Sequence, residues 1–460
     1  MVKALATTLI LSSVPMVCFA QGIVKEVSYE QGIFERFTGV LGIGVLIAIA
    51  FAFSNNRRSI NWRLVVSGSV LQILFAVLML MTPLGKLFFK ASSAFVGRML
   101  SFCDAGTRLV FGNLVQNSIS VVNSDGSATG MLVKTGSLVA FGVMPTVLFF
   151  SALSAVLYHL GVLQLIVRLL AGAIRYVLQI SGAESLAAAA NVFVGQTEAP
   201  LSIRPYLEKM TPSEIMAVMT GGFATVAGGV LVFYVGMLSE FFPDIAGHLV
   251  SASLMSAPAS LVMAKIMVPE TEVPLTQSGA TPDVEKQDLN VLDAATRGTS
   301  EGLSLALNVA AMLIAFTALI AMVNFCISLP ASWVGLEGIT LQRILGWLMS
   351  PLAFVLGVPL SDCVDVGGLM GTKTILNEFL AYLDLVSLLK EGKIDNPKSM
   401  VIATYALCGF SNFASIGIQI GGLSVIAPTR RKDFAKLGFK AMIAASLACF
   451  QTAAIAGIMM

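Results

Sequence analysis

Long apolar runs separated by short polar stretches dominate the pattern of hydrophobic positions along this chain. A helix of about 20 apolar residues crosses the hydrocarbon core of a bilayer, which is roughly 30 Å thick. Runs long enough to do so predict eight membrane-spanning helices, at residues 37–54, 64–83, 136–157, 214–238, 246–267, 302–329, 399–427 and 437–458. The pattern therefore predicts an all-α polytopic membrane protein.

A polar segment interrupts this pattern at Asn191–Leu201, directly after an alanine-rich run. Four of its side chains are polar: Asn191, Gln196, Thr197 and Glu198. A lipid-facing Glu at the bilayer centre costs about 3 kcal/mol or more, so such side chains normally face a cavity or a partner. Gly195 and Pro200 break the helical backbone, which at membrane depth persists only inside protein or beside water. We therefore expect a re-entrant hairpin near residues 184–210 that forms a binding site, the alternative being a capping cluster at the membrane surface.

The two halves of the chain repeat one order of elements: a surface helix, a polar hairpin carrying a Glu, and a span broken by small or polar residues. In the first half the Glu is Glu198 and the broken span contains Gly221–Gly229. In the second half Glu378 lies in a hairpin near residues 361–390, and the broken span contains Gly409–Gly417. Inverted repeats with discontinuous helices indicate a secondary transporter. Chance similarity between apolar segments is the alternative.

Two short basic loops orient the predicted spans. Asn55–Arg63 carries three arginines, and Thr429–Lys432 carries two arginines and a lysine. Eight alternating crossings place both loops on one face, and short basic loops are cytoplasmic. We therefore expect a multi-pass protein of the plasma membrane, in a bacterium the inner membrane, with both termini outside.

The segments between the spans complete the predicted organisation. The first half is predicted to contain a leader at 1–20 that resembles a signal peptide, N-terminal scaffold helices at 37–157 with an interfacial helix at Leu87–Leu114, and a first transport repeat at 160–267. A flexible cytoplasmic linker is predicted at 268–300. A scaffold helix at 302–329 and a second transport repeat at 339–460 follow it. Asn117–Gly130 is polar and predicts a surface loop. An uncleaved leader is the alternative for residues 1–20.

Composition agrees with a membrane protein and excludes several classes of function. The chain has 460 residues, of which 56% are hydrophobic and 12% charged, whereas soluble domains carry about 25% charged residues. The formal net charge of +2 favours neither nucleic acid nor acidic partners. Six scattered cysteines and two histidines predict neither a disulfide framework nor a zinc site. Without an H-E-x-x-H or G-x-S-x-G motif, we expect no catalytic residues and no enzyme.

The polar groups of the hairpins and broken spans predict an acceptor-rich site. Its candidate residues are Gln196, Thr197, Glu198, Asn377, Glu378, Asn412 and Ser415. Anionic cargo normally requires Arg or Lys, and Lys373 is the only such residue at hairpin depth. The site therefore favours a neutral cargo with several hydroxyl or N–H donors. Phe410 adds either an aromatic face for a ring or ordinary core packing.

A small cation fits the first broken span. Thr225 lies in the helix break Ala224–Gly229, which leaves carbonyl oxygens free, and Asn191 lies in the facing hairpin. Unwound carbonyls are the usual sodium site of such folds, and neither side chain titrates in the accessible range. Sodium is therefore favoured over a proton carried by Glu198 or Glu378. Close packing of small residues is the alternative for this break.

Three motifs make the chain similar to a known family. Gly195–Leu201, Asn377–Tyr382 and Cys408–Gly417 resemble signatures of the concentrative nucleoside transporters, and Asn55–Arg63 resembles the family's first cytoplasmic loop. The resemblance runs from about residue 37 to the end of the chain. It departs from the family's pattern at Leu380 and Ala414, neither of which is a proposed ligand.

The resemblance implies a sodium-coupled symporter that imports nucleosides by alternating access, as a homotrimer in the lipid bilayer with one pathway per protomer and no cofactor besides the sodium ion. The implied substrate contacts are Gln196, Thr197, Glu198, Val230, Glu378, Phe410, Asn412 and Ser415. The first hairpin would contact the nucleobase with Val230 beside it, and Glu378, Asn412 and Ser415 would hold the ribose hydroxyls. Sodium would be bound by Asn191, Val194, Thr225 and Val226. A proton-coupled nucleoside symporter and a transporter of another neutral polar solute are the alternatives.

Overall fold

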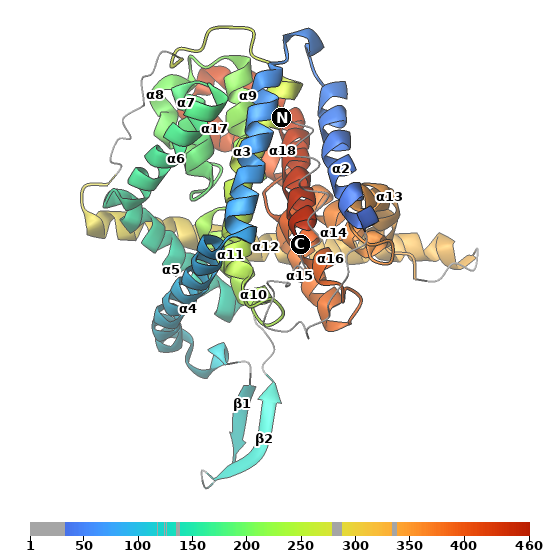
Figure 1. Ribbon diagram of the computed structural model, residues 1–460. Helices are drawn as coiled ribbons and strands as arrows, with labels where there is room; N and C mark the ends of the chain where they lie inside the picture. The colour runs from blue at the N-terminus through green and yellow to red at the C-terminus, as the bar shows by residue number, and fades with distance from the viewer. Residues whose placement is uncertain are drawn as a thin grey trace.

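The described part of the chain is built of helices with one small two-stranded sheet (Figure 1). The computed structural model describes residues 33–116, 118–123, 125, 127–134, 139–277, 288–333 and 338–460, so the predicted leader lies outside it. The first half contains α2 (Ile33–Ala52), α3 (Trp62–Ala76) continued by η2 (Val77–Met81), α4 (Pro83–Phe111), α5 (Val139–His159), α6 (Val162–Leu178), α7 (Gly182–Asn191), α8 (Arg204–Leu207), α9 (Pro212–Ala224), α10 (Gly228–Leu238) and α11 (Ile245–Met267). The second half contains α12 (Val291–Trp333), α13 (Leu341–Val355), α14 (Cys363–Ile375), α15 (Glu378–Lys390), α16 (Pro397–Leu407), α17 (Phe413–Ile426) and α18 (Arg431–Met459).

Each of the eight predicted spans has a helix or a broken helix at its place. Five helices of the described chain are long and apolar enough to cross a membrane: Trp62–Met81, Pro212–Leu238, Ile245–Met267, Val291–Pro330 and Pro428–Met459. For the other three, α2 is a shorter apolar helix, α5 meets α6 at a bend of 73°, and α16 with α17 forms a span of two half-helices. The all-α polytopic fold is confirmed.

The two hairpins lie toward opposite ends of the helix bundle (Figure 1). α7, α8 and α9 lie at one end together with α17, whereas α14, α15 and α16 lie toward the other end together with α10. The broken spans α9–α10 and α16–α17 therefore run in opposite directions. α9 contacts α17 and α10 contacts α15, so each half-helix packs against an element of the other repeat. This arrangement is the predicted inverted repeat.

α12 lies across the bundle and packs closely on α5 (Figure 1). A Cβ atom at Gly298 would lie 2.6 Å from the carbonyl oxygen of Ser151, so the two backbones approach too closely for a larger residue. Elsewhere α12 exposes large apolar side chains in the single chain, among them Ile314 and Phe325. An apolar surface of this extent needs lipid or another subunit against it.

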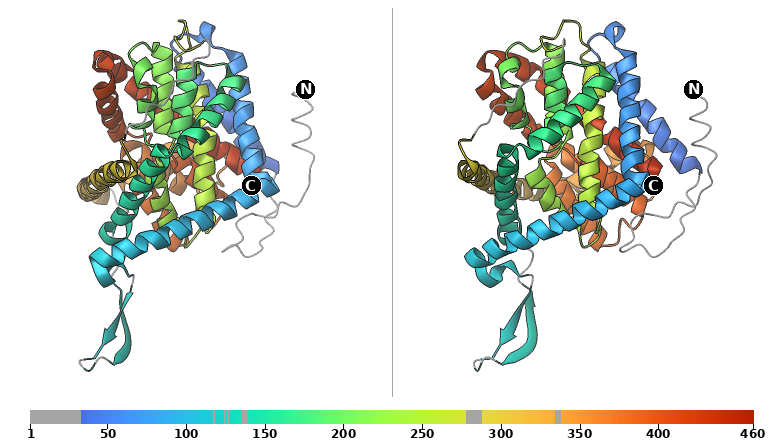
Figure 2. Two further views of the ribbon diagram at one scale, coloured as in Figure 1. Left: turned by 90° about the vertical axis from the view of Figure 1, so that its left-hand side faces the viewer. Right: turned by 60° about the vertical axis from the view of Figure 1, so that its left-hand side comes forward.

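Two strands form a β-hairpin where the polarity of residues 117–130 predicts a surface loop. β1 (Ser118–Val122) pairs antiparallel with β2 (Ala128–Lys134), and the hairpin projects from the bundle near the end of α4 (Figure 2). The Ser-Ile-Ser-Val run from residue 118 alternates polar with apolar residues, which is a strand pattern. Asp125 Oδ1 accepts hydrogen bonds from the backbone N–H of Ser127 over 2.9 Å and from its hydroxyl over 2.6 Å, which holds the turn.

The predicted linker at 268–300 is shorter than expected, and its described first part is anchored. α12 already begins at Val291. The Thr276 carbonyl accepts from the Gly182 N–H and the Thr276 hydroxyl oxygen accepts from the Ala183 N–H, both over 3.1 Å. These N–H groups open α7 and have no partner within the helix. The chain after α11 is therefore tied to the base of the first hairpin, contrary to the expectation of a loose linker.

Candidate functional site

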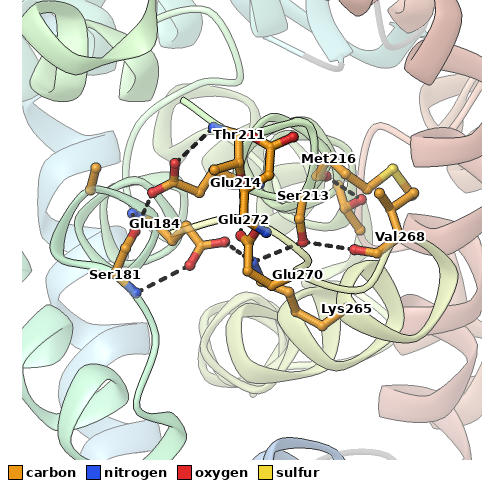
Figure 3. Close-up of polar contacts among 12 residues, drawn as sticks. Ser181, Glu184, Thr211, Ser213, Glu214, Met216, Lys265, Val268, Glu270 and Glu272 are labelled. Atoms are coloured by element: carbon orange, nitrogen blue, oxygen red, sulfur yellow. Dashed lines mark hydrogen bonds and ion pairs between the residues drawn. The ribbon is translucent and has the colours of Figure 1, made fainter. Parts of the chain in front are cut away.

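The base of the first hairpin is held by two capping boxes that share a hydrogen bond (Figure 3). Ser181 caps α7 with Glu184 as its partner, and Thr211 caps α9 with Glu214 as its partner. The Ser181 hydroxyl also donates to Glu214 Oε1 over 2.6 Å. Because each box satisfies the first backbone donors of its own helix, this additional bond ties the two helix starts together.

Lys265, near the end of α11, joins the acidic side chains of this cluster (Figure 3). Its ammonium group forms ion pairs with Glu184 and, over 3.2 Å, with Glu270, and it donates to the Ser213 hydroxyl over 3.0 Å. Lys265 is 5% exposed and Glu184 is 2% exposed, so each buried charge depends on the other. The hairpin base, α9 and α11 are therefore held together at one end of the bundle.

The tip of the first hairpin is unwound and rests on the break between α9 and α10. Irregular backbone follows α7 up to the 3₁₀ turn η4 (Ala199–Ile203). Glu198 Oε2 accepts from the Gly195 N–H over 3.3 Å, which closes the tip on itself. The Phe193 carbonyl accepts from the Gly228 N–H, at the first residue of α10, over 3.1 Å.

The tip of the second hairpin contains a helix cap and a carboxylate that accepts one hydrogen bond from the protein on each oxygen. Asn377 Oδ1 accepts from the Leu380 N–H over 2.8 Å and so caps α15. Glu378 is 6% exposed; its Oε1 accepts from the Tyr234 hydroxyl over 3.1 Å and its Oε2 from Asn412 Nδ2 over 2.8 Å. These donors compensate the buried carboxylate and join the second hairpin to α10 and to the start of α17.

Asn412 caps the start of α17 and connects this helix to Glu378. Its Oδ1 accepts from the Ser415 backbone N–H over 2.8 Å, while its Nδ2 donates to the carboxylate. The buried positions of α17 are Ser415, Gln419 and Leu423. Their spacing of four residues places them on one stripe of the helix. Gln419 therefore lies one turn beyond Ser415 on the same face.

Two glycines let the first hairpin tip pack closely on α9 and α17. A Cβ atom at Gly222 of α9 would lie 2.4 Å from Gln419 Nε2 and 3.1 Å from Gln196 Cβ. A Cβ atom at Gly422 of α17 would lie 2.8 Å from Thr197 Cγ2. Gln196 and Thr197 therefore lie against the inward face of α17, beside the buried stripe.

Asn191 and Thr225 meet around Gly221 of α9. The Thr225 hydroxyl donates to the Gly221 carbonyl over 3.0 Å, and a Cβ atom at Gly221 would lie 3.3 Å from Asn191 Nδ2. Asn191 is 1% exposed, yet neither Oδ1 nor Nδ2 has a hydrogen-bond partner. In the described chain, no backbone hydrogen bond outside the regular helices ends on the carbonyls of Asn191, Val194, Thr225 or Val226. Such oxygens suit a small cation.

Glu198 lies apart from Glu378. It is exposed and lines a cleft of about 70 Å³ between the hairpin tip, the start of α10, α5 and α12. Tyr158, Arg297 and Glu301 line the same cleft. Among the described residues, no hydrogen bond joins Glu198 to Glu378. Glu378 is not among the residues that line this cleft, so the two carboxylates predicted to share one site have different surroundings in this structure.

Val230 and Phe410 flank the two helix breaks. Val230 is buried in the first turn of α10, and the half-buried Phe410 packs against the core from the break between α16 and α17. Lys373 is fully buried; its Nζ donates to the Ala406 carbonyl over 2.8 Å at the end of α16 and lies 5.9 Å from the centre of the Phe450 ring. This lysine is therefore occupied by the protein, which agrees with a site for neutral cargo.

Two polar contacts in this region were absent from the sequence-based prediction. Tyr234, which donates to Glu378, lies in an apolar run that contains no local signal of such a role. Gln419 could have been found, because it is a polar residue four positions after Ser415 in an otherwise apolar helix.

Paired re-entrant hairpins, two oppositely directed broken spans and buried polar groups at the breaks define a secondary transporter. Three family models match the chain: the Na+ dependent nucleoside transporter N-terminus over residues 41–114, nucleoside recognition over 140–241, and the Na+ dependent nucleoside transporter C-terminus over 248–457. The nucleoside permease NupC of Helicobacter pylori is 39% identical over 428 residues, covering 93% of this chain and 98% of that protein. The chain belongs to the concentrative nucleoside transporter family, whose members are transporters and not enzymes.

Solved structures of a relative called CNTnw share this fold. The inward-facing, substrate-bound state is 41% identical with a TM-score of 0.81, over 92% of this chain and 98% of that chain. An outward-facing state of a doubly substituted CNTnw is 41% identical with a TM-score of 0.83, over 93% and 98% of the two chains. The protein is therefore a nucleoside transporter of this family, which two of the family models describe as Na+ dependent.

Proposed function

We propose that this protein is a sodium-coupled symporter that imports nucleosides by alternating access. The observation that carries the proposal is Asn191, a buried amide without a hydrogen-bond partner next to Thr225 and the break in the first broken span. An unsatisfied buried polar group costs about 1–3 kcal/mol, and coordination of a sodium ion would offset that cost. The carbonyls of Val194 and Val226 would complete the oxygen ligands.

Glu378 of the second hairpin, together with Asn412 and Ser415 at the start of α17, would hold the ribose hydroxyls. Each oxygen of Glu378 accepts one hydrogen bond from the protein, and an ionised carboxylate oxygen has room for a second. Hydroxyl groups can therefore be added to this network without displacing Tyr234. The charge of Glu378 would strengthen both bonds to the sugar.

On the first hairpin, Gln196, Thr197 and Glu198 would contact the nucleobase, with Val230 and Phe410 against the ring. Gln196 and Thr197 already lie against the face of α17 that carries Ser415. Glu198 lines the cleft toward α5 and α12, so it would reach the base in another conformational state. Inward-facing and outward-facing states of CNTnw support such movement in this family.

The protein would work as a homotrimer in the plasma membrane, in a bacterium the inner membrane, with both termini outside. The exposed apolar face of α12 would contact lipid and the neighbouring protomers. The basic loop Asn55–Arg63 supports the orientation, because it would lie in the cytoplasm.

Uptake by proteoliposomes tests this function. We expect labelled uridine and adenosine to accumulate under an inward sodium gradient, and not when choline replaces sodium. Uptake that follows a pH gradient in the absence of sodium would support proton coupling. A protein that takes up no nucleoside under either gradient would support the second alternative, a transporter of another neutral polar solute.

A further inference from the structure

We propose that Gln419 is a second residue that reads the nucleobase, and that the site prefers bases with an exocyclic amino group. The inference rests on the proposed nucleoside site and names the substrates that this site takes best. It starts from two buried glutamines, one from each repeat, that both pack against Gly222 and whose amide oxygens both lack a hydrogen-bond partner.

The orientation of the Gln419 amide follows from its partner. Gln419 Nε2 lies 3.2 Å from the Met219 carbonyl oxygen, and a carbonyl can only accept, so the amide nitrogen must face α9. The amide oxygen then faces away from Met219. Gln419 is fully buried and its Oε1 has no hydrogen-bond partner. A buried acceptor without a donor is unfavourable, and the protein itself does not supply a donor to this oxygen. A donor on a bound ligand would therefore stabilise it.

Gln196 presents a second acceptor of the same kind. It is 8% exposed, and its Oε1 also lacks a partner. Gly222 brings the two side chains together, since its missing Cβ would lie 2.4 Å from Gln419 Nε2 and 3.1 Å from Gln196 Cβ. Ser415, which would bind the ribose, precedes Gln419 by one turn on the same buried stripe. A base attached to that ribose would therefore extend toward the two amide oxygens.

An exocyclic amino group matches this pair of acceptors. Its single nitrogen carries two hydrogens, so it can donate one hydrogen bond to each oxygen. The bases of uridine and inosine offer one ring N–H and place a carbonyl oxygen where cytidine and adenosine carry the amino group. Two acceptors facing a carbonyl oxygen repel it, and unfilled polar groups in a site discriminate strongly. The site should therefore prefer cytidine to uridine and adenosine to inosine.

Substrate analogues test this in the unaltered protein. Binding is measured in sodium for adenosine against purine riboside, and for cytidine against the riboside of 2-pyrimidinone, because each second compound lacks only the amino group. We expect the loss of the amino group to weaken binding about tenfold in both pairs, as two neutral hydrogen bonds are removed. Equal binding within both pairs would overturn the inference and leave nucleoside transport intact. If none of the four compounds binds, the proposed function fails together with the inference.

Variants then assign the effect to Gln419. Gln419→Leu should reduce the preference for adenosine over purine riboside to about threefold, because only Gln196 then accepts from the amino group. Gln451→Leu is the matched control: Gln451 is fully buried in α18 with an unpartnered amide and lies outside the proposed site, so the preference should stay about tenfold. If Gln419→Leu weakens the binding of all four compounds equally, Gln419 is a structural contact between α17 and α9. That result would overturn its role in recognising the base. If Gln419→Leu does not fold, the analogue series in the unaltered protein decides the inference.

Discussion

The two hairpins differ in whether the protein supplies hydrogen-bond partners to the polar side chains that they bring to the site. On the second hairpin, Glu378 accepts from Tyr234 and Asn412, one donor to each carboxylate oxygen. On the first hairpin, Asn191 has no partner on either amide atom, and Gln196 lacks one on its oxygen. Glu378, Asn191 and Gln196 are all buried, so burial does not explain the difference.

The difference follows from the charge that each hairpin carries toward the site. Burying a carboxylate without partners costs far more than burying an amide without partners. The second hairpin therefore needs permanent protein donors for Glu378, which also fix the carboxylate before any sugar binds. At the tip of the first hairpin, the buried polar groups include the neutral amides of Asn191 and Gln196, whose cost is small enough to be offset when an ion or a base binds, whereas the charged Glu198 is exposed. The buried ionic cluster around Lys265 lies at the base of this hairpin and not at its tip.

The largest expected effect comes from breaking this base cluster. Lys265→Met would leave Glu184 and Glu270 without their cation, and removing one partner of a buried pair costs about 3–5 kcal/mol. We expect a clear loss of thermal stability in detergent. The matched control is Lys393→Met in the second repeat, where an exposed Lys393 pairs with Glu391 over 2.7 Å, and where little or no change is expected.

Thermal unfolding of both variants, followed by intrinsic fluorescence, checks this difference between the two repeats. Adding Glu184→Gln to Lys265→Met should restore part of the stability, because it removes one uncompensated charge. A Lys265→Met variant as stable as Lys393→Met would show that the cluster does not hold the first hairpin.

The second effect concerns the charged hairpin. Glu378→Gln keeps the shape of the side chain but removes the charge that strengthens its hydrogen bonds by roughly 1.5–3 kcal/mol. Nucleoside affinity should therefore fall about tenfold to a hundredfold in a binding assay with a purified protein that elutes as the unaltered one does. Nucleosides without ribose hydroxyls should lose less. Equal losses for both kinds of nucleoside would exclude Glu378 as the ribose ligand.

The third effect concerns the neutral amide of the first hairpin. Asn191→Ala and Thr225→Ala each remove one sodium ligand, so sodium affinity should fall roughly tenfold while sodium-free nucleoside binding changes little. Uridine affinity measured in sodium and in choline reports the coupling, which must be the same in both directions. Identical uridine affinity in the two salts for the unaltered protein would argue against a sodium site here.

The smallest effect is expected at Tyr234. Tyr234→Phe removes one of the two donors to Glu378, which loosens the carboxylate without removing its charge, so all nucleosides should bind about twofold to tenfold more weakly regardless of base. In the Tyr234→Phe/Glu378→Gln double variant, the loss should be close to that of Glu378→Gln alone, because the two residues act through one contact. Fully additive losses would mean that Tyr234 acts independently of Glu378.

The sequence alone determined most of the fold. Apolar runs identified the spans because crossing a bilayer requires about 20 apolar residues whatever the neighbours are. The Gly195 and Pro200 interruption located the first hairpin, because these residues act on the local backbone. The alternating residues of β1 are a local strand signal of the same kind, whereas the overall polarity of residues 117–130 predicts a loop.

The tertiary structure decided how the polar groups pair. The Tyr234–Glu378 bond joins residues 144 positions apart, and the Gln419–Met219 bond joins residues 200 positions apart. No local pattern encodes such partners, because they depend on which half-helix of one repeat packs against the other. Pooling all polar residues into one site therefore missed that Glu198 lies toward α5 and α12 while Gln196 lies beside Gln419. The sequence determined which residues are polar at membrane depth, and only packing determined which of their hydrogen bonds the protein leaves open for cargo.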